Sequence, residues 1–258
     1  MKVHLYFVCN VFSAITALML TCSTIRAGPA DELIKKGDDF DLKLQASEAL
    51  DLYLAAEKLE PRSASLLLRI ARQYRHLMVD AKTREEKIKL GGIGLDYALR
   101  ASALAPNDSE AQLSPAISYG KMLPLQSTKE QTQSARRIKE AVDKAIKLDP
   151  HNDLAWDVLG RWNKVLADVN GLQRALGSLL YGELPAGSNA EAVSCFEKAI
   201  EINPNRLMHY IELGQTYAQM GKPAEARRLI AKGLAMPDVE KDDPEIKRRG
   251  RETLAKLP

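Results

Sequence analysis

Apolar and small residues recur along this chain at spacings that predict pairs of packed α-helices. The clearest segment starts at Leu207, and its recurring residues are Tyr210, Leu213, Gly214, Tyr217 and Ala226. Apolar residues three and four positions apart lie on one face of a helix, and a small residue on that face lets a second helix approach closely. The tripeptide Gly221-Lys222-Pro223 interrupts the pattern as a turn does. The segment therefore predicts two antiparallel helices.

The same pattern occurs five times, which predicts a stack of repeats. The segments run near residues 30–63, 64–108, 109–152, 153–206 and 207–240. Their spacing is that of the tetratricopeptide repeat (TPR), a helix–turn–helix unit of about 34 residues. One unit cannot bury its apolar stripe alone, so neighbouring units must stack. We therefore expect an all-α fold over residues 28–258, a right-handed α-solenoid of about five TPR-like helix pairs.

The second, third and fourth units are longer than the standard repeat. The largest expansion, residues 164–188, has apolar residues at helical spacings and predicts an added helical segment. These residues include Val165, Leu172, Leu176 and Leu180. In the second unit, Gly94 is predicted to be the close-packing position of the second helix. Gly91 and Gly92 are predicted to belong to the turn before that helix.

The chain has a distinct segment at each end. Residues 1–27 combine Lys2, an apolar stretch and a small residue before a turn, which predicts a signal peptide. An uncleaved N-terminal anchor and a lipoprotein signal at Cys22 are the alternatives. The protein is then exported, as a periplasmic, secreted or membrane-anchored protein. Residues 242–256 predict a capping helix that shields the last repeat, with Asp242 or Asp243 as its N-terminal cap.

Composition and charge narrow the possible functions. The chain is 45% hydrophobic, 28% charged and 5% aromatic, with a formal net charge of +3. Two of the basic residues, Lys2 and Arg26, lie in the predicted signal peptide, so the remainder is nearly neutral. This balance argues against bulk electrostatic binding to nucleic acid. Cys195 is the only cysteine after the predicted signal, and we expect it to pack in the core.

The fourth unit carries motifs that go beyond the general repeat. These are Gly160-Arg161-Trp162-Asn163, Tyr181-Gly182-Glu183-Leu184-Pro185 and Phe196-Glu197-Lys198-Ala199. Over residues 141–234 the sequence resembles the regulator of microtubule dynamics family. The resemblance implies a non-enzymatic helical repeat domain, linked in animals to microtubules, spindle poles and organelle surfaces. It makes a microtubule-associated regulator, in the cytoplasm or on the cytoskeleton, the alternative to an exported protein.

No constellation of residues in the sequence indicates catalysis. The histidines at 4, 76, 151 and 209 lack a metal-ligand spacing. The acidic cluster of Asp38, Asp39 and Asp41 is not followed by the glycine and glutamate of a calcium loop. No nucleophile elbow is present. We therefore predict a protein that is not an enzyme, without catalytic residues, metal or cofactor.

The first helix of each TPR unit lines the concave face of such arrays, and this position identifies the candidate partner-binding residues. They are Arg72, Arg75, His76, Lys121, Asp157, Arg161, Lys164, Met208, Ile211 and Gln215. The middle of the predicted groove is basic, which favours an acidic peptide or an anionic head group. A solvated charged face without a ligand is the simpler alternative.

Two functions of different classes follow from this surface. The first is a scaffold that binds a protein or peptide segment in its groove by apolar anchors flanked by polar contacts. The second is the binding of a lipid or other amphiphile in a cavity closed by residues 164–188. Enclosure by Val165, Leu172, Leu176 and Leu180 favours the amphiphile, whereas an open groove favours the peptide. The sequence indicates neither the partner nor the oligomeric state.

Overall fold

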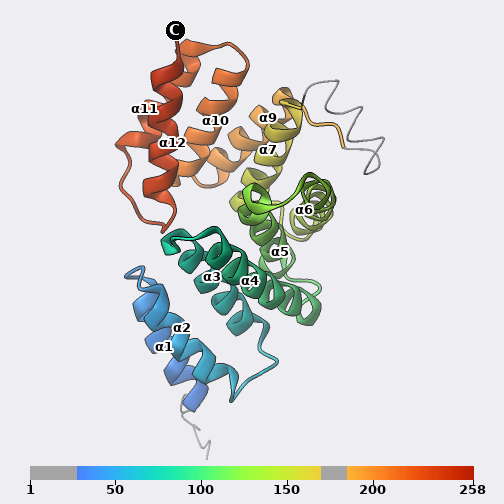
Figure 1. The fold of residues 1–258 in the computed structure, drawn as a ribbon, viewed down its shortest axis with the longest axis vertical. Helices are drawn as coiled ribbons and strands as arrows, with labels where there is room; N and C mark the ends of the chain where they lie inside the picture. Colours follow the sequence, from blue (N-terminus) through green and yellow to red (C-terminus); the bar gives the residue numbers. More distant parts are fainter. Residues whose placement is uncertain (1–27, 170–184) are drawn as a thin grey trace, which may run out of the picture.

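The computed structural model describes residues 28–169 and 185–258, and the regular elements in these two ranges are all helices (Figure 1). The first helices of successive units are α1 (Pro29–Asp41), α3 (Ala64–Asp80), α5 (Ser109–Met122), α7 (Asp153–Ala167) and α10 (Leu207–Gln219). The second helices are α2 (Ala46–Glu57), α4 (Arg84–Leu104), α6 (Thr128–Leu148), α9 (Asn189–Ile202) and α11 (Pro223–Ala235). A short 3-10 helix, η1 (Leu123–Leu125), follows α5, and α12 (Asp243–Lys256) ends the chain.

The helices pack as five hairpins in a curved row. Within each unit the two helices lie against each other, and the second helix of a unit packs on the first helix of the next (Figure 1). The last helix, α12, packs on α10 and α11. This arrangement confirms the predicted all-helical solenoid.

Glycines allow the two helices of a unit to come close, as the repeat pattern predicts. A methyl group added at Gly160 of α7 would lie 2.7 Å from an edge carbon of Phe196 on α9. At Gly214 of α10 it would lie 2.6 Å from Ile230 of α11. Real side chains do not tolerate such contacts, so these positions are restricted to glycine by packing.

The prediction for the glycines of the second unit is partly wrong. Gly94 does face α3, with Ala71 and Tyr74 close to the place of a missing methyl group. Gly91 and Gly92, however, lie inside α4 and not in a turn. The helix begins earlier because Thr83 caps it, with its hydroxyl accepting a bond from the Glu86 amide at 3.1 Å.

Cys195 lies in α9 with 6% of its surface exposed. Burial raises the pKa of its thiol to about 11, so the thiol is protonated and unreactive at neutral pH. The residue packs in the interior, as the sequence predicts.

Two predicted segments lie outside the described residues. Residues 1–27, the expected signal or anchor, are one of them, and Leu172, Leu176 and Leu180 of the expansion belong to the other. Export and the extra helical segment therefore stay predictions. Within residues 28–169 and 185–258, no helix combines the length and the apolar character that a membrane span needs.

Candidate partner-binding groove

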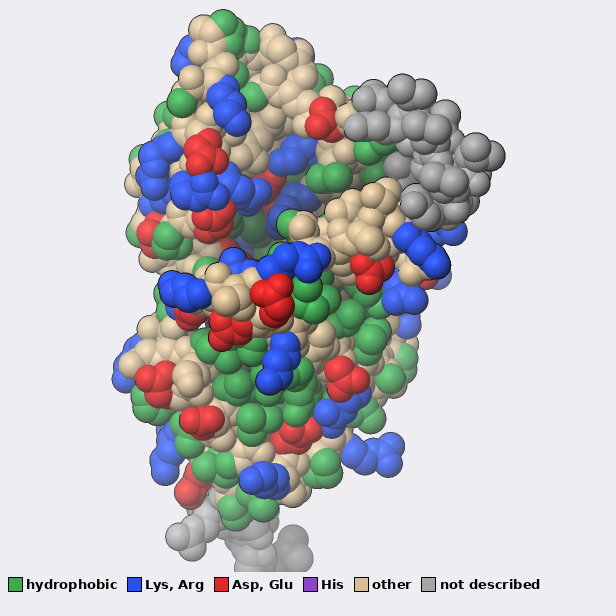
Figure 2. All heavy atoms as spheres, viewed as in Figure 1, with side chains coloured by type: hydrophobic (Ala, Val, Ile, Leu, Met, Phe, Trp, Pro, Cys, Tyr) green, Lys and Arg blue, Asp and Glu red, His purple; other side chains and the backbone are tan. Residues whose placement is uncertain are grey.

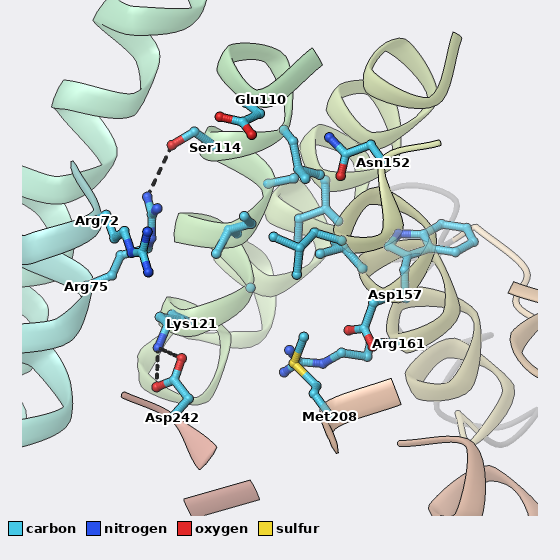
Figure 3. Close-up of a pocket in the computed structure, with 18 of the residues that line it drawn as sticks. Arg72, Arg75, Glu110, Ser114, Lys121, Asn152, Asp157, Arg161, Met208 and Asp242 are labelled. Carbon is cyan, nitrogen blue, oxygen red and sulfur yellow. Dashed lines mark hydrogen bonds and ion pairs between the residues drawn. The ribbon is translucent and has the colours of Figure 1, made fainter. Parts of the chain in front are cut away.

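The first helices of the five units, with α6 and the loop before α12, line a groove that encloses about 1570 Å³. Figure 2 shows the surface hollowed between the C-terminal helices and the helices of the middle units, with Lys and Arg side chains near the hollow. Seven of the ten predicted site residues line this cavity. They are Arg72, Arg75, His76, Lys121, Asp157, Arg161 and Met208. Figure 3 shows Arg72 and Arg75 entering from α3, opposite Arg161 and Met208.

Arg75 is the most unusual cation in the groove, because it is buried without a carboxylate partner. Its side chain donates from one guanidinium nitrogen to the hydroxyls of Ser114 at 3.1 Å and Ser118 at 3.2 Å on α5. Only 8% of the residue is exposed, and among the described residues no carboxylate lies within ion-pair distance. Burial lowers the pKa of Arg75 to about 10, which leaves it protonated at neutral pH. A positive charge is thus held at the floor of the groove.

His76 does not add to this charge. It is 6% exposed, and its Nδ1 lies 3.9 Å from an Asp41 oxygen. Burial, with Arg72 and Lys121 nearby, lowers the pKa of His76 to about 3. The imidazole is neutral at physiological pH, so the basic part of the groove consists of arginine and lysine.

The loop between α11 and α12 crosses the groove and brings carboxylates to its basic side chains. We call residues 236–242 the acidic turn. Asp242 accepts two bonds from Lys121 Nζ, both at 2.6 Å (Figure 3). Glu240 pairs with Arg72 of α3 at 3.3 Å and with Arg206 at 3.4 Å. Lys241 pairs with Asp80, at the end of α3, at 3.0 Å.

The acidic turn is held in shape by α12 itself. The carboxylate of Asp243, which is 1% exposed, accepts bonds from the amides of Val239 at 2.8 Å and Glu240 at 2.7 Å. Lys247 pairs with Asp238 at 2.6 Å. Asp242 occupies the predicted cap position of α12, but its side chain makes no capping bond and reaches Lys121 instead.

Nothing in the repeat pattern indicates that this turn reaches the groove. The acidic residues 238 and 240 belong to the end of the predicted fifth unit, and 242 and 243 to the start of the predicted capping helix. Their contacts with α3 and α5 depend on how far the solenoid curves. Local spacing does not encode that curvature.

Lys164, Ile211 and Gln215, also predicted as groove residues, lie outside the cavity. Lys164 contacts the buried carboxylate of Glu212 and donates to Gln215 at 3.1 Å. Glu212 is fully buried, and Arg249 of α12 also reaches it at 2.9 Å. Burial disfavours the charge, but Lys164, with neighbouring arginines, holds the pKa of Glu212 well below its usual range. Ile211 is fully buried in the C-terminal core.

Arg161 lies both at the groove and near the buried Glu212. It lines the groove, and its Nε lies 3.6 Å from Glu212. Its side chain is 41% exposed, so it can still present charge to a ligand.

Asp157 lines the groove and joins α7 to α10 through a histidine. Its Oδ2 lies 2.8 Å from His209 Nδ1, while Asp153 Oδ2 lies 2.9 Å from His209 Nε2. Burial opposes the charge on His209, but its bonds to Asp153 and Asp157 raise its pKa above the usual value. The other oxygen of Asp157, Oδ1, is buried and has no hydrogen-bond partner among residues 28–169 and 185–258.

An apolar wall adjoins the charged part of the groove. It is formed by α5, α6 and α7, and the unlabelled side chains at the centre of Figure 3 belong to the same cavity. Its larger residues are Leu113, Ile117, Ile138, Leu154, Val158 and Trp162. The indole of Trp162 donates to the Ala135 carbonyl at 2.8 Å, which fixes the ring. The groove therefore suits a ligand with both an apolar and an anionic part.

Comparisons with known proteins agree with the architecture. The family model described as Regulator of microtubule dynamics protein 1-3 matches residues 29–258. The mouse Regulator of microtubule dynamics protein 1 is 29% identical over 220 residues, which are 84% of this chain and 72% of the mouse protein. The protein of that name from Caenorhabditis elegans is 26% identical over 184 residues, 71% of this chain and 81% of the relative.

A thermophilic TPR protein from Thermus thermophilus has a similar solved structure. It matches with a TM-score of 0.60 and 17% identity, over 88% of this chain and 99% of the other. At this identity the likeness supports the TPR-like fold and no particular function.

Proposed function

The chain belongs to the Regulator of microtubule dynamics protein 1-3 family, and from this premise we propose that it is a non-enzymatic scaffold whose groove binds a segment of a partner protein. The segment carries acidic residues for the basic side chains and an apolar anchor for the apolar wall of α5, α6 and α7. We propose no catalytic role for any residue of the groove.

One observation supports this proposal above the others. Cations from three helices, Arg75 of α3, Lys121 of α5 and Arg161 of α7, converge on one cavity beside an apolar wall. Carboxylates form strong charge-assisted bonds with such groups. Peptides that bind in helix-lined grooves place apolar anchors in pockets and polar groups around them. A simple solvated face has no need of an unpaired arginine that is 8% exposed.

Selection from a random peptide display library tests the proposal directly. We expect selected peptides to combine acidic residues with one or two large apolar residues. Synthetic copies should bind Arg72→Glu about tenfold more weakly, because a bound carboxylate then faces a like charge. Arg228→Glu on the outer face of α11 is the matched control and should bind as the wild type does. Equal binding to wild type and Arg72→Glu contradicts the proposal.

The apolar wall supports a second candidate, the binding of a lipid or other amphiphile. Val165 is 54% exposed at the edge of the cavity, and an acyl chain beside it would gain from leaving water. Native mass spectrometry of the purified protein should then show co-purified lipid, and Val158→Asp should lose it. Lipid-free protein that still binds the selected peptides rules this candidate out.

The family supports a third candidate, in which the partner is the microtubule. The names of the mouse and nematode relatives describe regulation of microtubule dynamics. Co-sedimentation with purified microtubules should retain the wild-type protein and lose Arg72→Glu if the groove makes the contact. Absence of the wild-type protein from the pellet excludes this partner and agrees with an exported protein.

A further inference from the structure

We infer that the groove recognises two acidic residues separated by one residue, and that the chain's own acidic turn occupies this site as a displaceable competitor. The inference rests on the proposed binding function and adds the ligand pattern and its regulation. The resident copy of the pattern is Glu240-Lys241-Asp242.

The two carboxylates of the turn contact separate cations of the groove. Glu240 pairs with Arg72 on α3, and Asp242 with Lys121 on α5. The field of Asp242 also reaches Arg75 and Arg161, whose positive charges it favours. Asp242 therefore supplies the negative charge that the floor of the groove otherwise lacks. An incoming peptide carboxylate has to take the same place.

These contacts run across the solenoid and not along it. Arg72 and Glu240 are 168 positions apart, and Lys121 and Asp242 are 121 positions apart. A repeat array is stabilised by contacts between adjacent units, and α12 already has its own apolar contact through Ile246, which is 4% exposed. The turn is thus not required to complete the stack of hairpins.

The turn is anchored to its own helix α12, but its contacts with α3 across the groove are exposed, which makes the segment that carries Glu240 and Lys241 displaceable from the groove. Arg72 and Glu240 keep 45% and 32% of their side chains exposed, and Asp80, the partner of Lys241, keeps 54%. Exposed ion pairs of this kind stabilise little. Of the two large apolar residues of the turn, Met236 packs against the core at its start, whereas Val239, next to the ion-paired residues, is 59% exposed. A partner segment that adds an apolar anchor to the same two carboxylates therefore competes favourably with it.

Asp242 does not cap α12 with its side chain, although it stands at the cap position. It stands at the N-terminal cap of α12, where an aspartate side chain usually bonds the first free amides of the helix. Its carboxylate turns to Lys121 instead, with no capping bond. When a ligand displaces the turn, Asp242 can return to the cap while α12 stays packed on α10 and α11.

The test uses the full chain with the isosteric substitutions Glu240→Gln and Asp242→Asn together. The control is Glu252→Gln, which removes an exposed carboxylate of α12 that pairs with Arg248 of the same helix. The probe is a labelled synthetic peptide with the sequence of residues 236–246, and a second peptide carries the same two amide substitutions. Fluorescence anisotropy gives the affinities.

We expect the acidic peptide to bind the double variant about tenfold more tightly than the wild type or Glu252→Gln, because most wild-type grooves are occupied by their own turn. The amide peptide should bind none of the proteins. If the acidic peptide binds the wild type and the double variant with equal affinity, the acidic turn does not compete for the groove. If the acidic peptide and the amide peptide bind with equal affinity, the groove does not recognise the two acidic residues.

A measurement without ligand separates this inference from the proposed function. Spin labels at Glu85→Cys and Val239→Cys, with the native cysteines replaced by alanine, report the distance between the turn and the second unit. We expect one narrow distribution in the wild-type background and a broader, longer one with Glu240→Gln and Asp242→Asn. Identical distributions overturn the inference. If the distributions differ while no acidic peptide binds any variant, the turn is displaceable and the proposed binding of acidic segments is wrong.

Discussion

Arg75 keeps a positive charge at the floor of the groove although burial disfavours it. A buried charge without a partner usually costs stability, and the two serine hydroxyls that accept from Arg75 offset only part of that cost. One of them, Ser118, also donates to the Ser114 carbonyl at 3.2 Å, so it keeps a partner without the arginine. We infer that a carboxylate ligand needs Arg75 more than the fold does.

Replacing Arg75 with methionine should therefore separate stability from binding. We expect the free energy of unfolding to change by less than about 1 kcal/mol, or to rise, because a buried charge is removed and the volume is kept. The affinity for the acidic peptide should fall about tenfold, because the peptide carboxylate that takes the place of Asp242 loses the attraction of a nearby buried positive charge. Urea unfolding and fluorescence anisotropy give the two quantities. A loss of about 3 kcal/mol or more, typical of a broken buried ion pair, would instead make Arg75 a structural residue.

His209 makes the interface between α7 and α10 dependent on pH. Asp153 and Asp157 raise its pKa in the folded state, whereas the unfolded value is about 6.5. Protonated His209 therefore adds to the free energy of unfolding. This contribution is fully present below about pH 6.5 and is lost as the pH rises through the pKa of the folded state. The free energy of unfolding of the wild type should therefore decline over this interval, relative to His209→Gln.

Urea unfolding between about pH 5.5 and 8.5 measures this difference, a range centred near the unfolded pKa of histidine. The difference between the two proteins reports His209 alone. His76, whose pKa is lowered to about 3, changes the stability with pH in the opposite direction, but it is present in both proteins and cancels. His151→Gln, at an exposed histidine between α6 and α7, is the control and should follow the wild type. Parallel curves for wild type and His209→Gln would contradict a charged His209 in the fold.

At the scale of the helices, glycine has opposite effects at two positions. A methyl group at Gly160 would meet the ring of Phe196 at 2.7 Å, whereas at Gly92 no atom of the described residues outside the adjoining backbone of α4 lies within 4 Å. We expect Gly160→Ala to lower the free energy of unfolding by about 1–3 kcal/mol, as overpacking does. Gly92→Ala should raise it by up to about 1 kcal/mol, because alanine favours the interior of α4. Thermal unfolding of both variants checks the pair, and destabilisation by Gly92→Ala would show that α4 does not continue through this position.

The same positions explain why the fold could be predicted from the sequence. Gly160, Gly214 and Gly94 mark where two helices touch, and this information lies within one unit. The start of α4 was misplaced because Gly91 and Gly92 indicate a turn by composition, while Thr83 and Glu86 set the true beginning. The residues that define a helix pair lie within one repeat unit, so the sequence predicts the pairs. Boundaries depend on capping bonds that compete with propensity.

The groove could be predicted less completely, because its residues meet only in the assembled solenoid. Position in the repeat placed Arg75, Lys121 and Arg161 on the concave side, and they do line the cavity. The same rule predicts Lys164 as a groove residue, but Lys164 forms an ion pair with Glu212 of the next unit. The sequence predicts Asp242 as a cap of α12, and the side chain contacts Lys121 instead. Its partner, Lys121, lies 121 positions away, and only the curvature of the whole array brings them together.

At the scale of the whole molecule, the acidic turn ties the C-terminal unit to α3 and α5 and so bridges the two sides of the groove (Figure 1). The bridge consists of ion pairs, several of them exposed. Salt should weaken it, since charges in contact with solvent are screened within about 8–10 Å near physiological ionic strength. Packing of α12 on α10 and α11 places Gly250 against Ile211 and Ile230, and its ion pair from Arg249 ends on the fully buried Glu212. Buried pairs are screened much less than exposed ones, so this packing should respond little.

The spin-label pair at positions 85 and 239 tests this difference. Raising the salt from about 0.05 to about 0.5 M should broaden and lengthen its distance distribution in the wild-type background, because the Debye length falls several-fold. The variant with Glu240→Gln and Asp242→Asn should already show the broad distribution at low salt and change little. A second pair, Ala224→Cys on α11 and Glu252→Cys on α12, should stay narrow throughout. If salt broadens both pairs alike, the whole C-terminal unit loosens, and the groove is not opened by the acidic turn alone.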